Sequence, residues 1–129
     1  MDKNLQTLEL DKVLAILAEQ TTCDDAKEAA LALRPAADPG EIALLLDQTE
    51  DAFSMLARFG APSFGGLHNV NGPLQRAAAG GCLNMTELLQ VGDTLRALRI
   101  LDDWHGHLAG TSSSLNFFFD GITVNKYLE

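Results

Sequence analysis

The stretch DDWHGH at residues 102–107 holds the densest cluster of potential metal ligands and acid–base groups in the chain. Asp103 and His107 are four residues apart, which places both side chains on one helix face, where they could share a metal ion. Gly106 weakens that turn, and no third ligand lies at a supporting spacing, although metal sites need three or four ligands. We therefore expect a solvated helix end, with His107 stabilised by the helix dipole.

The glycine-rich stretch GAPSFGG at residues 60–66 could instead suggest a phosphate-binding loop. Such a loop needs a Lys-Ser/Thr pair after it and an apolar strand before it, and both are missing, so we expect a connecting loop. The sequence also lacks the Gly-x-Ser-x-Gly of a hydrolase nucleophile elbow. Trp104, the one tryptophan, is expected to anchor a core or an interface. We expect no catalytic, cofactor-binding or metal-binding residues in the chain.

The composition favours a helical protein that does not contact nucleic acid directly. Of 129 residues, 47% are hydrophobic and 6% aromatic, and the abundance of Ala and Leu over β-branched residues favours helix over sheet. The net charge is −9, and 12 of the 18 acidic residues lie within residues 1–60. A surface of this charge repels phosphate.

Several features favour a cytoplasmic protein with reduced thiols. Cys23 and Cys82 are too few and too far apart to indicate a disulfide framework or a zinc site. The first 15 residues lack the layout of a signal peptide. No apolar run approaches the ~20 residues that a membrane span needs.

The first 35 residues predict two helices. Residues 5–20 carry apolar residues at helical spacing, namely Leu10, Val13, Leu14 and Leu17. In the stretch that follows, Thr22 or Asp24 can cap a second helix. Arg34 lies near its end, and Pro35 closes it because the residue before a proline avoids the α region.

Residues 39–59 have the clearest helix start. Asp38 is the N-cap candidate, Pro39 suits the first helical position, and Glu41 has the spacing of a capping box. Gly60 is a natural terminator. The apolar side of this helix is expected to consist of Ile42, Leu45, Leu46, Phe53 and Leu56.

The segment RAAAGGCLNMTELL at residues 76–89 predicts a sharp break between a short helix over 71–79 and a long one over 85–108. Gly80 and Gly81 end the short helix by allowing positive φ. Asn84 caps the long helix, with Glu87 as its reciprocal partner. The break is therefore geometric and lets the short helix lie across the long one. Apolar residues recur along the long helix at Leu88, Val91, Leu95, Leu98 and Leu101.

The remaining residues predict a flexible break over 109–114, a short helix in LNFFFDG and the start of another in ITVNKYLE. A helix over 85–108 would be roughly 36 Å long, hardly shorter than a compact domain of this size is wide. We therefore expect an elongated bundle of about five helices, cut from a longer protein that covers its ends and the three phenylalanines at 117–119. Leu128 and Glu129 fit a native sequence and a tag remnant equally well.

The order of four segments resembles the start of the bacterial MutS-two proteins, MutS paralogues that often carry a C-terminal Smr nuclease domain. The segments are LELDKVLAILAEQTT, AKEAALALRP, EIALLLDQTEDAFSML and PLQRAAAGGCLNMTELLQVGDTLRALRIL. The family opens with a TLEFDKIL-like helix, here Thr7 to Leu14. A RA-x-x-GG-x-L-x-x-x-ELL segment, here Arg76 to Leu89, and a long helix follow. The resemblance covers nearly the whole chain and weakens after Leu108.

The resemblance implies that residues 1–129 are the N-terminal portion of an all-α, MutS-type core or lever domain. In such proteins, levers join a DNA-clamping end to an ATPase end. The ATPase, with its ATP and Mg, and the Smr endonuclease lie downstream, so the fragment itself is expected to be non-catalytic and without cofactors. The mismatch-reading Phe-x-Glu of MutS repair proteins is absent, which fits the MutS-two branch. The family is associated with branched DNA and recombination control, or with ribosome rescue.

The resemblance also implies the partners. The fragment would pack on the rest of its parent chain, a homodimer that reaches DNA through its other parts and is not bound to a membrane. Two alternatives stay open: a self-contained helical module that binds another protein, and a small metal-dependent enzyme that uses DDWHGH. The leucine-rich faces keep no strict heptad, which favours packing within one chain over a dimeric coiled coil.

Overall fold

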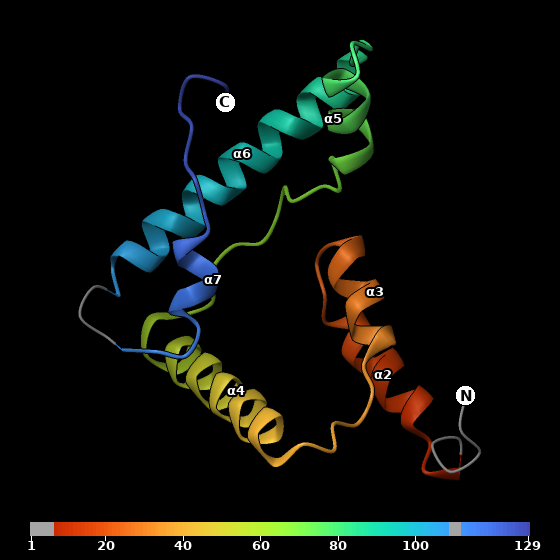
Figure 1. Ribbon diagram of the computed structural model, residues 1–129. Helices are drawn as coiled ribbons and strands as arrows, with labels where there is room; N and C mark the ends of the chain where they lie inside the picture. The colour runs from red at the N-terminus through yellow and green to blue at the C-terminus, as the bar shows by residue number, and fades with distance from the viewer. Residues whose placement is uncertain (1–6, 109–111) are drawn as a thin grey trace. The chain divides into compact units, whose positions relative to one another are not determined.

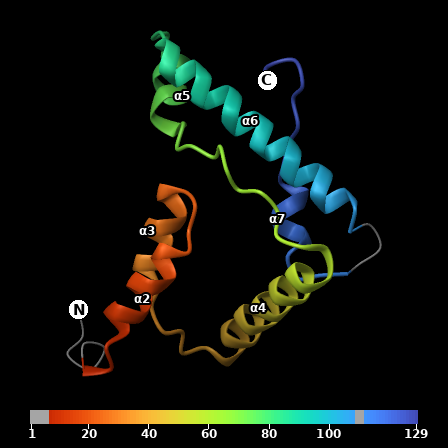
Figure 2. The same cartoon turned by 180° about the vertical axis from the view of Figure 1, so that it is seen from behind.

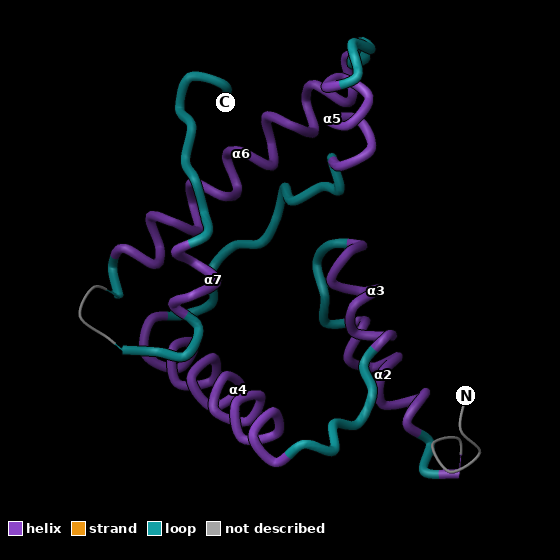
Figure 3. Tube along the Cα trace, viewed as in Figure 1, coloured by secondary structure: helices purple, strands orange, loops and turns teal. Residues whose placement is uncertain are grey.

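The computed structural model describes residues 7–108 and 112–129. Within these ranges every regular element is an α-helix, labelled α2 to α7 in Figure 1, and Figure 3 shows no strand in the same ranges. The all-α fold class is confirmed for the part of the chain described. None of these helices combines the length and hydropathy that crossing a membrane requires. The chain divides into two compact units, Met1–Pro35 and Ala36–Glu129.

The first unit is a helical hairpin. Helix α2 spans Leu10–Glu19 and α3 spans Asp24–Ala32, and the two lie side by side in Figures 1 and 2. Leu14, Ala18 and Ala30 are buried in this unit. From the expected apolar side of α2, Leu14 is buried, whereas Val13 and Leu17 are exposed, because one short neighbouring helix covers only a narrow strip.

The ends of these two helices differ from the prediction. Cys23, in an extended conformation and without a side-chain cap, is the N-cap of α3, so the expected capping by Thr22 or Asp24 is wrong. Helix α3 ends at Ala32, and the Arg34 guanidinium beyond it donates to the carbonyl of Leu33 at 2.6 Å. Helix α2 begins only after Glu9, whose φ is 55°. Residues 5 and 6 of the expected helix lie outside the described residues.

The second unit opens with α4, which spans Pro39–Phe59 as predicted. The Asp38 carboxylate accepts a hydrogen bond from the Glu41 amide at 2.9 Å, and Gly60, with φ 78°, ends the helix. Met55 is the buried residue of α4. The five residues expected on its apolar side all remain exposed, from 36% for Ile42 to 73% for Phe53.

Helices α5 (Asn71–Ala78) and α6 (Met85–Gly106) are joined by the predicted glycine corner. Gly80 has φ 88°, as expected, but Gly81 is not among the described glycines with positive φ. Gly81 is needed for a different reason. A Cβ there would lie 2.7 Å from Cγ and 2.9 Å from the carbonyl oxygen of Arg76. Gly80 is therefore needed for its left-handed backbone conformation, and Gly81 is needed because a side chain there would collide with Arg76.

Polar contacts fasten this corner. Asn84 Oδ1 accepts from the Glu87 amide, and Glu87 Oε2 accepts from the Asn84 amide, both at 2.9 Å, which completes the predicted capping box. Arg76 of α5 reaches the corner as well, forming an ion pair with Glu87. These contacts hold α5 beside the start of α6, as Figures 1 and 2 show.

The chain ends with the short helix α7, Asn116–Asp120, which packs against α6. Residues 121–129 form no helix, so the helix start expected there is wrong. The β-branched residues Ile122, Thr123 and Val124 disfavour it, and the Asn125 side chain accepts from the Tyr127 amide in a turn at 3.1 Å. The buried residues of the second unit are Met55, Ala97, Leu101 and Leu108.

Candidate functional site

The residues of DDWHGH make separate contacts in the structure. The His105 ring stacks on the Phe119 ring with centroids 4.4 Å apart, and its Nε2 lies 3.2 Å from Asn116 Oδ1. Asp103 pairs with Arg99 at 3.6 Å, while His107 is the exposed C-cap of α6. Across residues 7–108 and 112–129, no three His, Cys, Asp or Glu side chains gather as a potential metal site. Asp102, Asp103, Gly106 and His107 are exposed, as expected for a solvated helix end, whereas Trp104 and His105 are half-buried.

The loop after α4 helps to line an apolar cavity of about 190 Å³ in the second unit. Pro62 and Phe64, from the stretch weighed above as a phosphate loop, contribute two of its walls. The other lining residues come from α4, α6, α7 and the residue before α7, and they are Ala52, Met55, Leu56, Trp104, Leu115 and Phe119. With no carboxylate, amine or imidazole in its lining, the cavity offers no acid–base chemistry.

Asp51 of α4 fixes the chain that leads into α7. Its Oδ2 accepts hydrogen bonds from the Ser114 amide at 2.6 Å, the Ser114 hydroxyl at 2.8 Å and the Ser113 hydroxyl at 3.0 Å. These bonds, that from the Ser114 amide first, lower the pKa of Asp51. Residues 109–111 of the expected flexible break lie outside the described residues, but Ser113 and Ser114 are held in place by this carboxylate.

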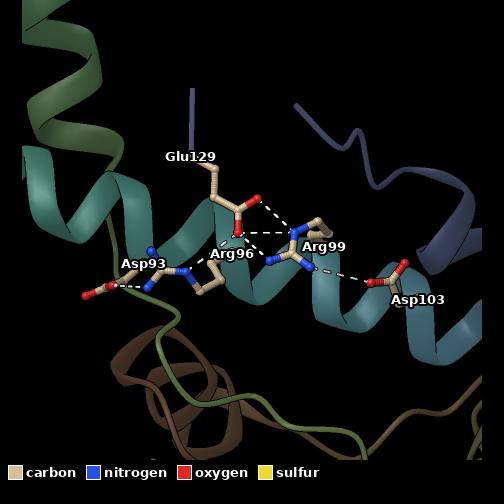
Figure 4. A network of polar contacts seen from close by, with 5 residues as sticks. All are labelled: Asp93, Arg96, Arg99, Asp103 and Glu129. Atoms are coloured by element: carbon tan, nitrogen blue, oxygen red, sulfur yellow. Dashed lines mark hydrogen bonds and ion pairs between the residues drawn. The ribbon is translucent and has the colours of Figure 1, made fainter. Parts of the chain in front are cut away.

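The most concentrated charge lies midway along α6, where two arginines meet the carboxylate of Glu129 (Figure 4). Arg99 donates from Nε to both carboxylate oxygens, at 3.1 and 2.8 Å, and from its terminal nitrogen to Oε1 at 2.6 Å. Arg96 Nε lies 3.6 Å from the same Oε1. The hydrogen bonds from Arg99 lower the pKa of Glu129 and raise that of Arg99.

Both arginines also face acidic residues of their own helix. Arg96 lies 3.4 Å from Asp93, and Arg99 lies 3.6 Å from Asp103, as the dashed lines of Figure 4 show. Lys126 lines the same open depression as Arg96, Arg99 and Glu129.

Sequence patterns predicted neither this network nor the contacts of Asp51. The three-residue spacing of Arg96 and Arg99 on a predicted helix could have marked them as neighbours on one face. No local pattern could have paired Arg99 with a residue 30 positions later, or Asp51 with serines more than 60 positions later. The prediction of no catalytic, cofactor-binding or metal-binding residue stays a prediction.

Comparison with protein-family models finds no match. Comparison with curated proteins finds relatives named Endonuclease MutS2. The chain is 40% identical over 97 residues to that of Agathobacter rectalis and 36% identical over 103 residues to that of Acetivibrio thermocellus. It is 38% identical over 114 residues to that of Geobacillus thermodenitrificans. These matches cover 75%, 80% and 83% of the chain.

The chain spans only 12–14% of the length of these relatives. Each match therefore concerns one small segment of a much longer protein. The resemblance seen in the sequence is confirmed over that segment.

Proposed function

We propose that this chain, which belongs to the MutS2 family, is a non-catalytic lever. The lever would link the DNA-binding and ATPase parts of a longer protein. The observation that carries this proposal is the exposed apolar side of α4. Leu46 is 64% exposed and Phe53 is 73% exposed, and the other apolar residues on that side are also exposed.

Exposure of this kind is costly for a free protein. Burying one Leu or Phe side chain stabilises a protein by roughly 1.5–3 kcal/mol, and contiguous apolar patches usually mark an interface. The start of α6 shows the same feature, with Met85 and Leu89 exposed by 74% and 63%. Because the relatives are seven to eight times longer than the matched segment, the rest of such a chain can supply the cover.

The second unit also has the stiffness that a lever needs. Helices α4 and α6 contain 21 and 22 residues, so each is roughly 30 Å long. The corner before α6 is braced by the capping box and by the ion pair between Arg76 and Glu87. A displacement at one end of α6 would therefore move the whole helix together with α5. The braced corner between the two helices would not bend.

The activity of the longer protein is part of the proposal. Its relatives are named as endonucleases, and the family resemblance implies an ATPase that uses ATP and Mg, in a cytoplasmic homodimer. The net charge of −9 supports contact with DNA through other parts of that protein. Branched DNA in recombination control and stalled ribosomes are the two substrates that the resemblance implies.

The lever role is tested in a full-length family member that carries this segment. Gly80→Ala strains the corner where the chain must adopt positive φ. We expect basal ATP hydrolysis to be retained and its stimulation by branched DNA to be lost. Gly92→Ala, on α6 where a Cβ meets no neighbour within 4 Å, is the matched control and should leave both rates unchanged. Normal stimulation in the Gly80→Ala protein would contradict the lever role.

The passive role is tested on the chain by itself. Fluorescence anisotropy with a four-way junction at low salt should give only weak binding, because the surface is acidic. Submicromolar affinity would contradict this part of the proposal, and so would ATP hydrolysis or DNA cleavage by the purified chain.

The exposed apolar sides also favour the second candidate, a self-contained module that binds another protein. The coding sequence that follows residue 129 distinguishes the two. A Gly-x-x-x-x-Gly-Lys-Ser/Thr segment there supports the lever, whereas a stop codon directly after Glu129 supports the self-contained module.

A further inference from the structure

Three of the four basic residues that follow residue 60 converge on a single carboxylate. They are Arg96 and Arg99 of α6 and Lys126 of the C-terminal segment, and the carboxylate is that of Glu129. In a chain with twice as many acidic as basic residues, this grouping of cations is unusual. The proposed lever makes no use of it.

We infer that Arg96 and Arg99, with Lys126 beside them, form a carboxylate-binding site on α6 that accepts an acidic side chain of a peptide segment, and that Glu129 occupies this site in the present chain. The inference goes beyond the proposed function, since a passive lever needs no such site.

The geometry of Arg99 is the first argument. Its guanidinium makes three hydrogen bonds of 2.6–3.1 Å that engage both oxygens of Glu129, the forked arrangement in which arginine recognises a carboxylate. Arg96 adds a second guanidinium at 3.6 Å. The side chains of Glu129 and Arg99 are 14% and 30% exposed, whereas that of Arg96 is 56% exposed, so the fork lies in the open depression that these residues line. Most surface ion pairs lack such a fork.

The local charge is the second argument. Arg96, Arg99 and Lys126 carry three positive charges, and Asp93, Asp102 and Asp103 near them carry three negative charges, so the surroundings of the Glu129 carboxylate are close to neutral. A nucleic acid would bring several phosphates toward Asp93, Asp102 and Asp103 and toward a chain of net charge −9, so repulsion disfavours it.

Weak attachment of the C-terminal segment is the third argument. Tyr127 is 99% exposed and Leu128 is 69% exposed, so the residues next to Glu129 bury little surface. The last residues are therefore held largely by the carboxylate itself. An acidic side chain from another segment can replace Glu129 without breaking an apolar contact.

The test uses the whole chain with Glu129→Gln, which replaces the charged carboxylate in the site by a neutral amide and changes no helix. Its probe is the peptide GITVNKYLE, the sequence of residues 121–129, added in solution. The readout is the NMR resonance of the Nε–H group of Arg99, which reports directly on the guanidinium. We expect a saturable shift toward its position in the unaltered chain. The matched peptide GITVNKYLQ, which has the same C-terminal carboxylate, should bind about tenfold more weakly, because a charge-assisted fork is lost.

Two variants show whether the fork recognises the carboxylate. Arg99→Lys keeps the charge but removes the fork, so affinity for GITVNKYLE should fall to that for GITVNKYLQ. Arg96→Lys should have a smaller effect, because Arg96 makes a single long contact. Equal binding of the two peptides, or unchanged binding to the Arg99→Lys chain, would overturn the inference.

Three further probes identify the source of the anion. Acetate, inorganic phosphate and a short DNA duplex are titrated against the Glu129→Gln chain. We expect each to bind more weakly than GITVNKYLE. Equal binding of acetate would assign the site to small carboxylates, and tighter binding of phosphate or DNA would assign it to phosphate groups. Each of these results would overturn the acidic-peptide ligand.

Discussion

Helices α4 and α6 have nearly the same length and a similar leucine-rich sequence, yet they differ in what covers them. Helix α4 has Met55 as its buried residue, and the apolar side expected from its sequence is exposed. The C-terminal half of α6 instead buries Ala97 and Leu101, with α7 packed against it. Figures 1 and 2 both show α7 beside this half of α6.

The difference shows that an amphipathic pattern predicts which side of a helix needs cover, and that the cover itself must come from elsewhere. Within the described residues of the second unit, α7 packs against α6, whereas no helix makes a contact of that extent with α4, whose apolar side is exposed. The same contrast exists within α6, whose first turns expose Met85 and Leu89.

The largest predicted effect is a difference in stability between a substitution on the covered part of α6 and one on the exposed side of α4. Leu101→Ala should lower the free energy of unfolding by about 2–4 kcal/mol, because it leaves a cavity in the covered half of α6. Leu45→Ala on α4, where the residue is 48% exposed, should cost no more than about 0.5 kcal/mol. Chemical denaturation measures both. Equal losses would mean that the apolar side of α4 is covered in the isolated chain.

The next effect concerns the corner before α6. Gly80→Ala should lower the free energy of unfolding by about 1–2 kcal/mol, since φ at this position is 88°. Gly92→Ala, inside α6 with no neighbour within 4 Å of the new Cβ, should raise it by about 0.4–1 kcal/mol. The melting temperature should therefore fall for Gly80→Ala and rise for Gly92→Ala. A melting temperature that rises for Gly80→Ala would contradict the role of this corner.

A smaller effect compares the caps of the two long helices. Asn84→Ala removes the side-chain half of a reciprocal capping box, whereas Asp38→Ala removes one described side-chain cap bond. Each should cost about 1 kcal/mol. The larger loss is expected for Asn84, because the Glu87 amide loses its acceptor and the remaining bond from the Asn84 amide to Glu87 Oε2 loses its reciprocal partner. Denaturation of the two variants in parallel measures the difference. A larger loss for Asp38→Ala would be inconsistent with the tighter start of α6.

The smallest effect is a dependence of stability on pH at the contact between α4 and the chain before α7. The pKa of Asp51 is lowered in the folded chain, from an ordinary value of 3.8, by its bonds to Ser114 and Ser113. The resulting stability is present above that ordinary value and is lost as pH falls through the lower, folded-state value.

The measurement is the free energy of unfolding between pH 7 and pH 3, compared with that of Asp51→Asn. The pKa values of Glu87 and Glu129 are lowered too. These two residues therefore contribute the same acid loss of stability to the unaltered chain and to Asp51→Asn. Asp51→Asn should therefore show a shallower acid loss. Identical curves would mean that the bonds from Ser113 and Ser114 to Asp51 do not contribute in solution.

Local signals in the sequence predicted the second unit's helices better than its contacts. Asp38, Pro39 and Gly60 fixed the bounds of α4, and Asn84 with Glu87 fixed the start of α6, because capping depends on neighbouring residues alone. The role of Gly81 was misassigned, since its need for space depends on the Arg76 backbone five residues earlier. The C-terminal segment was wrongly expected to be helical, and its ion pairs join residues that no periodic pattern relates.

The central claim is that the apolar side of α4 is covered in the longer protein, and thiol labelling tests it most directly. Cys23 and Cys82 are replaced by Ser, and Phe53→Cys is introduced into the chain by itself and into a full-length family member that carries it. Asp47→Cys, at an exposed polar position of α4, is the reference. The account predicts that the thiol at position 53 reacts quickly in the isolated chain and much more slowly in the full-length protein, while that at 47 reacts equally in both. Equal rates at position 53 would contradict it.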